Sequence, residues 1–220
     1  MIEQLLPEAA ASAESRTQLP ELKLFPEEER VLGAAVEKRR REFVAGRACA
    51  RAALLKLGVP ATPIGGGPHG EPLWPAAVVG SITHCRGYTA SAVAYRHDLL
   101  ALGIDAERNE ALPAGVLAQI AFGTERERCA SAPGVHGDRL LFSAKEAVYK
   151  AWFPITGRTL SFADVRIALD LEAGQFRAAL LVAAPLVEGV PLTELRGRWS
   201  AEEDVILTAV ALPRQRARWA

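Results

Sequence analysis

The sequence is short of cysteine and carries no excess charge, and each shortage excludes a class of protein. Its three cysteines lie far apart and form no CxxC pair, so we expect neither a disulfide framework nor a zinc knuckle. The 26 basic and 26 acidic side chains balance each other. This balance argues against a nucleic-acid partner and against attachment to membranes through a basic surface.

Long apolar runs and nucleotide-binding loops are absent as well. No run approaches the roughly 20 apolar residues of a membrane helix, and the first residues carry Glu3 and Glu8 without the basic start of a secretory signal. We therefore expect a cytoplasmic protein with no membrane partner. Neither a Walker loop nor a G-x-G-x-x-G motif occurs, which excludes the usual nucleotide cradles.

The residues that are present predict a globular fold built from helices and antiparallel strands. Half of the 220 residues are apolar, and this length suits one large domain or two small ones. We expect a loosely structured lead-in over 1–26 that is partly paired onto the body. One long helix, or two in line, follows over 26–58, where Gly33 and Gly46 weaken the helix without ending it. A glycine- and proline-rich loop covers 60–75.

Strand and helix patterns alternate in blocks through the rest of the chain. Strands are predicted over 78–83, 89–95 and 99–107, helices over 113–122, 124–129 and 138–152, and further strands over 165–171, 176–182, 195–200 and 205–212. This order predicts an α+β fold rather than strict βαβ alternation. The halves 1–102 and 103–220 each read as a helix packed on an antiparallel sheet, which suggests a pseudo-duplicated architecture without a clear internal repeat.

Two motifs place carboxylates where they can act together. In LGIDAERN, Asp105 and Glu107 end an apolar strand and share one of its faces. Two carboxylates so close repel each other unless a cation or a proton lies between them. The same pair is also typical of an exposed strand end with solvated acids.

The second motif, FSAKEAVYKAW, spaces Glu146 and Lys150 four residues apart on one helix face. An ordinary solvated ion pair is the alternative, but bulky apolar neighbours leave little of this helix facing solvent. Glu146 beside Asp105 and Glu107 would complete an all-oxygen site of the kind that suits magnesium. Lys150, one turn away, is placed to contact a phosphate or to donate a proton.

Two further groups remain ambiguous on their own. His84 follows a strand of small residues that includes Thr83, and a lone histidine is more often structural than functional. Arg40, Arg47 and Arg51 are spaced by seven and four residues, so they fall on one side of the predicted helix. Guanidinium groups suit phosphate oxygens, although a solvated helix face has the same pattern.

Taken together, these motifs resemble a known family. VVGSITHC, GIDAE and FSAKEAVYKAW, in this order and spacing, resemble the 4′-phosphopantetheinyl transferases of the surfactin- and enterobactin-synthetase type. EFVAGRACAR resembles that family too, in particular its enterobactin-synthetase component D branch. The similarity runs over 39–161. It implies a pseudo-twofold pair of α+β halves with the cofactor between them.

The resemblance also implies roles for individual residues. Asp105, Glu107 and Glu146 correspond to the ligands of a magnesium ion on the coenzyme A pyrophosphate, and Glu146 and Lys150 to catalytic residues. Many relatives carry a basic residue where this chain has Gly70, so either the preceding His69 contacts that anionic end of coenzyme A or the contact is missing. The implied coenzyme A contacts are Arg47, Arg51, His69, Thr83, His84 and Lys150.

The implied reaction transfers the 4′-phosphopantetheine group of coenzyme A to a serine of an apo acyl or peptidyl carrier protein, in fatty-acid, polyketide, siderophore or peptide synthesis. Segment 108–128, which includes Val116 and Leu117, is the expected carrier-docking surface of a monomer. Two other readings stay open. One is a magnesium-dependent pyrophosphatase acting on coenzyme A or nucleotides, and the other is a non-catalytic coenzyme A-binding module.

Overall fold

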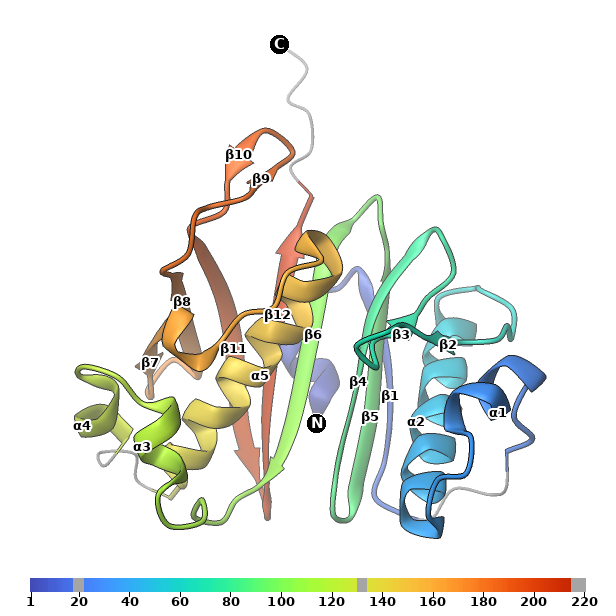
Figure 1. The fold of residues 1–220 in the computed structure, drawn as a ribbon, viewed down its shortest axis with the longest axis horizontal. Helices are drawn as coiled ribbons and strands as arrows, with labels where there is room; N and C mark the ends of the chain where they lie inside the picture. The colour runs from blue at the N-terminus through green and yellow to red at the C-terminus, as the bar shows by residue number, and fades with distance from the viewer. Residues whose placement is uncertain (18–21, 130–133, 215–220) are drawn as a thin grey trace.

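Two antiparallel sheets, each covered by one long helix, organise the chain (Figure 1). The computed structural model describes residues 1–17, 22–129 and 134–214. The first sheet has the strand order β1 (Ala10–Ser15), β5 (Tyr88–Tyr95), β4 (Val78–Cys85). The second has the order β6 (Leu99–Arg108), β12 (Val205–Pro213), β11 (Glu194–Glu202), β8 (Gln175–Leu180), β7 (Val165–Asp170). The α+β class expected from the sequence is confirmed.

Each long helix packs on the sheet formed by its neighbours in sequence. Helix α2 (Glu37–Lys56) lies on β1 and β5, and α5 (Gly137–Thr156) lies on β6 and β12. Gly103 lets α5 approach β6 closely, because a Cβ at this position would lie 2.1 Å from the carbonyl oxygen of Ala147. The buried face of α5 combines small alanines with larger leucine, valine and aromatic side chains, and Gly157 in the left-handed region ends the helix. The close packing brings the polar residues of α5 next to the carboxylates of β6.

Strands β4 and β6 form the seam between the two sheets. They run side by side in the same direction (Figure 1), yet they belong to separate sheets. Two hydroxyls of β4 bridge the gap: Ser81 Oγ accepts from the Ile104 amide at 3.1 Å, and Thr83 Oγ1 accepts from the Ala106 amide at 3.0 Å. Side chains thus satisfy strand-edge amides that a direct ladder would otherwise pair.

The predicted lead-in and first helix need correction. Residues 1–17 hold a 3-10 helix, η1 (Ile2–Leu5), and the edge strand β1, and Ile2 is fully buried. The pairing onto the body is therefore confirmed, and the loose structure is wrong for these residues; 18–21 lie outside the described residues. Gly33 does end helix α1 (Pro26–Leu32), with φ at +54°. Because Glu28 of α1 reaches Arg51 near the far end of α2, the two helices lie side by side rather than in line.

The remaining elements are short. They are β2 (Gly65–Gly66), β3 (Pro72–Leu73), α3 (Val116–Ile120), α4 (Glu125–Cys129), η2 (Phe162–Asp164), β9 (Leu186–Val187) and β10 (Val190–Pro191). The main strands and α5 lie within a few residues of their predicted positions. Across the described ranges, none of the helices combines the length and the apolar character that a membrane span requires.

Candidate active site

One face of α5 presents polar side chains to β6. They recur at intervals of three or four residues and therefore share one side of the helix: Arg139, Ser143, Glu146 and Lys150. On β6, Asp105 and Glu107 are two residues apart on a common strand face. The fold thus brings the two predicted motifs, LGIDAERN and FSAKEAVYKAW, into one cluster beside the seam.

Asp105 is the most connected residue of this cluster. Its side chain is buried, and Lys150 Nζ donates to Asp105 Oδ1 at 2.7 Å. Ser143 Oγ donates to the other carboxylate oxygen at 2.8 Å, and Thr83 Oγ1 donates to Oδ1 at 3.3 Å. The carboxylate therefore joins β4, β6 and α5, and Lys150 keeps 27 % of its side chain exposed.

The other two carboxylates lie in the electrostatic field of Asp105. Burial, reinforced by the charge of Asp105, raises the pKa of Glu146 above its ordinary value. The same two causes raise the pKa of Glu107, although Arg139 Nη1 donates to Glu107 Oε2 at 3.0 Å and opposes the rise. No hydrogen bond or ion pair joins Glu146 to another of the described residues. The cluster is consequently short of positive charge around Glu146.

The donor chemistry of this cluster fits magnesium, which prefers carboxylate oxygens. The geometry is not that of an assembled metal site: across 1–17, 22–129 and 134–214, no three His, Cys, Asp or Glu side chains are grouped so as to hold a metal ion. Lys150 and Arg139 supply the cationic partners of Asp105 and Glu107 instead. The raised pKa values of Glu107 and Glu146 indicate that a bound cation would stabilise their ionised carboxylates.

His84 and Thr83 lie on the β4 side of the same cluster. Thr83 is buried, and its hydroxyl lies 3.4 Å from Lys150 Nζ. Burial lowers the pKa of the half-buried His84; of the nearby charges, Glu42 raises this pKa, and Arg39 and Lys150 lower it. Its Nε2 lies 3.4 Å from Nη1 of Arg39, which is exposed at the start of α2. An imidazole and a guanidinium therefore line the solvent side of the cluster.

Arg47 and Arg51 lie elsewhere, buried between α2, α1 with the segment before it, and the start of β2. Arg47 Nε donates to the Ile64 carbonyl at 3.0 Å, and its guanidinium lies 4.1 Å from the centre of the Phe43 ring. Arg51 pairs with Glu28, whose side chain is fully buried. Both arginines are thus engaged by the protein, and their predicted contact with coenzyme A stays a prediction.

His69 reaches across from the loop between β2 and β3 to α5. It is exposed, and its ring packs edge-on against Phe153, with centroids 5.0 Å apart. Phe153 in turn contacts Tyr149, with ring centroids 5.8 Å apart. The loop from the first half of the chain therefore touches the C-terminal part of the catalytic-helix candidate.

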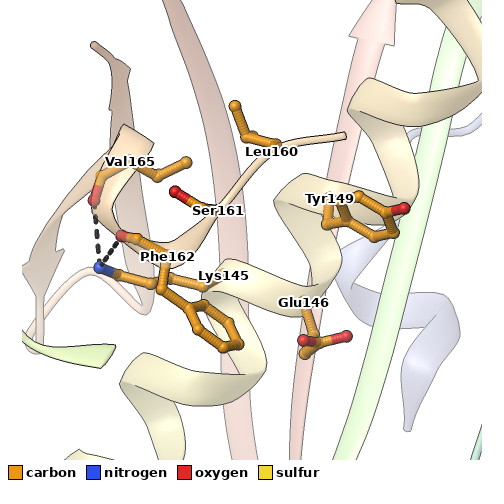
Figure 2. A pocket seen from close by; sticks show the side chains of 7 residues that line it. All are labelled: Lys145, Glu146, Tyr149, Leu160, Ser161, Phe162 and Val165. Carbon is orange, nitrogen blue, oxygen red and sulfur yellow. Dashed lines mark hydrogen bonds between the residues drawn. The ribbon is translucent and has the colours of Figure 1, made fainter. Parts of the chain in front are cut away.

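A pocket of about 270 Å³ opens next to Glu146 (Figure 2). Its walls come from α5 and from the segment that leads into β7, and they are Lys145, Glu146, Tyr149, Leu160, Ser161, Phe162 and Val165. Figure 2 shows Lys145 directed toward Phe162 and Val165, while Glu146 points away from them. The lining is mostly apolar and aromatic with one carboxylate at its edge, which suits an extended amphipathic ligand.

Sequence reasoning missed four residues that touch this cluster. Ser143 and Arg139 share the face of Glu146 and Lys150, so helical spacing is the signal that would have found them. Arg39 lies next to Arg40 but gave no periodic signal. Thr208 hydrogen-bonds Ser143 and pairs with Asp105 in register, which only the topology reveals.

Comparisons with known proteins agree with one another. The description "4′-phosphopantetheinyl transferase N-terminal domain" matches residues 27–94, and "4′-phosphopantetheinyl transferase superfamily" matches 101–203. The chain is 48% identical over 219 residues to 4′-phosphopantetheinyl transferase Svp of Streptomyces mobaraensis, covering 96% of this chain and 89% of that protein. It is 45% identical over 220 residues to 4′-phosphopantetheinyl transferase Npt of Nocardia iowensis, covering 96% and 99%. Enterobactin synthase component D of Salmonella typhi is 39% identical over 125 residues, covering 55% and 51%.

Proposed function

This chain belongs to the 4′-phosphopantetheinyl transferase superfamily, and we propose that it transfers the 4′-phosphopantetheine group of coenzyme A to a serine of an apo carrier protein at the cluster around Asp105. The observation that carries the assignment of the site is the meeting of β6 and α5 there, with Lys150 on Asp105 and Glu146 left without a protein partner. In this proposal, residues 1–102 contact the nucleotide, and residues 103–220 supply the metal ligands and α5.

Asp105, Glu107 and Glu146 would hold magnesium, because they supply three carboxylate groups in one electrostatic environment. When bound, magnesium supplies positive charge that offsets the charge developing on the pyrophosphate. Lys150 adds a second positive charge from α5, and its partial exposure leaves it free to exchange Asp105 for a phosphate oxygen.

Glu146, or a water that it orients, accepts the proton of the carrier serine. Unlike Asp105 and Glu107, Glu146 accepts no hydrogen bond from the described residues, so its oxygens are available to the metal and to the serine or water. The serine oxygen forms a bond to the phosphorus on the pantetheine side, and the bond from that phosphorus to the bridging oxygen breaks. Adenosine 3′,5′-bisphosphate leaves with that oxygen, and Lys150 donates a hydrogen bond or a proton to it.

The nucleotide end binds on the β4 side of the cluster. His84 and Thr83 contact the phosphates, and Arg39 is the exposed guanidinium beside them. Arg47 and Arg51 were expected at the 3′-phosphate. Because both are buried, we expect them to support coenzyme A binding indirectly, by holding the loop that carries His69. A direct contact with the 3′-phosphate would require them to break their present bonds to the protein.

The pocket beside Glu146 takes the pantetheine arm. The arm is flexible and amphipathic, and the pocket offers apolar walls from Leu160, Phe162 and Val165 together with the Tyr149 ring. Glu146 borders both this pocket and the Asp105 cluster. In this proposal, the arm extends from the reacting phosphorus at the Asp105 cluster, past Glu146, into the pocket beside α5.

Intact-mass analysis of apo carrier proteins tests this function. With coenzyme A and magnesium, the carrier should gain the mass of one phosphopantetheine group, and adenosine 3′,5′-bisphosphate should appear in equal amount. A pyrophosphatase would release nucleotide without any carrier, and a binding module would bind coenzyme A and release none. A panel of fatty-acid, polyketide and peptide-synthetase carriers identifies the acceptor. Because one chain supplies both sides of the cluster, a monomer should be active.

A further inference from the structure

Lys145 is the most enclosed charged side chain on α5, although it stands next to Glu146 in sequence. Only 1 % of its side chain is exposed. Its Nζ donates to four oxygens: Ile120 O at 2.7 Å, Phe162 O at 2.9 Å, Val165 O at 3.0 Å and Glu125 Oε2 at 3.0 Å. An ammonium has three protons, so this cage fully satisfies it and leaves it no free donor for a ligand.

Glu125 completes the arrangement from the other side. It is buried, and its Oε2 accepts from the Phe122 amide at 2.8 Å. Its Oε1 accepts from the Ile167 amide at 2.7 Å. The ion pair therefore ties three separate parts of the chain together: α5, the α3–α4 segment 120–125, and the segment 162–167 that contains η2 and the start of β7.

The last of these segments forms a wall of the pocket beside Glu146. Phe162 and Val165 each give a carbonyl oxygen to Lys145, and both line the pocket. Figure 2 shows these two hydrogen bonds running from Lys145 to the segment opposite α5. Lys145 therefore ties this wall of the pocket to α5.

We propose that Lys145, with Glu125, is a positioning residue that fixes the width of the pantetheine pocket and makes no contact with the phosphates. This inference rests on the proposed function, because it assumes that the pocket takes the arm. Lys150 on the same helix differs: it is partly exposed and has one carboxylate partner that a phosphate can replace. Neighbouring lysines of one motif thus have separate tasks.

Two ligands separate these tasks in a binding experiment. Coenzyme A carries the arm, whereas adenosine 3′-phosphate 5′-diphosphate keeps both phosphates of the pyrophosphate and lacks the arm. Titration calorimetry with magnesium should compare wild type with Lys145→Met, Glu125→Gln and Lys145→Arg. If the wall moves, each variant should bind coenzyme A on the order of tenfold more weakly, and the arm-less nucleotide within about twofold of wild type.

Lys145→Arg separates geometry from charge. A planar guanidinium keeps the charge but cannot fit a cage of carbonyls built for a compact ammonium. It should therefore show the same selective loss as Lys145→Met. Rescue by arginine, or an equal loss for both ligands, would mean that the charge acts on the phosphates, and it would overturn the proposal.

Leu54→Ala is the control for lost stability. Leu54 is fully buried in the α2 core, in a hydrophobic cluster separate from the one that includes the pocket residues Phe162 and Val165. If this control has a melting temperature similar to that of the pocket variants, it should bind both ligands as tightly as wild type. The same selective loss of coenzyme A binding in the control would refute the proposal. Failure of all three pocket variants to fold would refute it too. If wild type binds coenzyme A but modifies no carrier, the proposed function fails while the pocket result stands independently.

Discussion

Two buried clusters of this protein both contain carboxylates and cationic side chains, but they differ in how completely protein partners satisfy the carboxylates. In the first, Glu28 of α1 is fully buried and accepts from Arg51, from the Phe25 amide at 2.9 Å and from the Ile64 amide at 3.1 Å. In the second, Asp105 is similarly surrounded by Lys150, Ser143 and Thr83. Yet the second cluster also holds Glu146, which has a raised pKa and no ion-pair partner within the described ranges.

The difference separates a cluster that holds the fold together from one that is prepared for a ligand. Around Glu28, both carboxylate oxygens accept from protein donors, although the cluster sets two arginines against one carboxylate and leaves Arg51 Nε buried without a hydrogen-bond partner among the described residues. Around Asp105, three carboxylates share too few cations, and the lysine is partly exposed. Unbalanced charge of this kind is costly for stability and typical of sites where a metal ion or substrate completes the balance.

Removing carboxylates from the Asp105 cluster should have the largest effect on activity. Asp105→Asn and Glu146→Gln keep the side-chain shapes but remove a proposed metal ligand or the proposed base, so transfer to a carrier should fall by roughly 10³-fold or more. Carrier modification followed by intact mass gives the rate, and circular dichroism checks the fold. Asp170→Asn, at the exposed end of β7, is the matched control and should retain activity. Comparable activity in Asp105→Asn would place the chemistry elsewhere.

Two arginines of α2 test whether the Glu28 cluster serves stability and the Asp105 cluster serves coenzyme A binding. Arg47→Ala leaves the Ile64 carbonyl without a buried donor, so it should cost about 1–3 kcal/mol of stability. Arg39→Ala, at an exposed position, should change stability by less than about 0.5 kcal/mol. It should instead weaken coenzyme A relative to dephospho-coenzyme A by about tenfold to a hundredfold.

Thermal denaturation and titration with the two ligands measure both effects. If Arg47→Ala melts normally and discriminates poorly between coenzyme A and its dephospho form, Arg47 reaches the 3′-phosphate directly, and the Glu28 cluster is part of the binding site. In that case the two clusters would not differ in the way proposed.

Much of the fold was predictable because its strongest signals are local. Strand period placed Asp105 and Glu107 on one face, and helix period placed Glu146 beside Lys150. Edge strand β1 was not predicted as a strand, because AASAES lacks the branched and aromatic residues typical of strands. Its pairing with β5 depends on residues about eighty positions away.

The state of the charged groups was less predictable, because it depends on distant partners. The spacing of Arg47 and Arg51 indicated that they share a helix face. It did not indicate that Arg51 would be buried in an ion pair with Glu28, which lies 23 residues earlier in the sequence. Lys145 likewise meets oxygens from segments that lie 17 to 25 residues away. Helical spacing identifies which residues share a face, and only the tertiary packing decides whether that face meets solvent, protein or a ligand.

The carrier-docking surface should respond more weakly. Val116 and Leu117 were expected to be exposed there, but both are half-buried against the core of the second half, so a charge at either would test stability instead. Arg126 is exposed beside a hollow of about 480 Å³ between α3 and α4. Arg126→Glu should raise the KM for an acidic carrier by roughly three- to tenfold, mainly at low salt. Coenzyme A affinity should not change; Arg177→Glu, at an exposed position of β8, is the control.

Neutralising one glutamate in each cluster should change stability in opposite directions. Glu28→Gln removes the charged partner of Arg51 inside the closed cluster, so it should destabilise the protein by about 2–4 kcal/mol. Glu146→Gln removes a charge that burial and Asp105 already disfavour, so without metal or coenzyme A it should stabilise the protein by about 1 kcal/mol or less.

The gain in Glu146→Gln should depend on pH with a definite sign. Because the folded-state pKa of Glu146 lies above its unfolded value, ionisation of this group costs stability at any pH above the folded pKa. The cost fades as pH falls through that pKa, since the folded protein then takes up a proton. The variant should therefore melt higher than wild type at pH 8, by about 2–4 °C per kcal/mol, and the advantage should vanish toward pH 4.5. A variant that melts lower than wild type at pH 8 would show that Glu146 is already balanced by the protein, and the cluster around Asp105 would then be as closed as the one around Glu28.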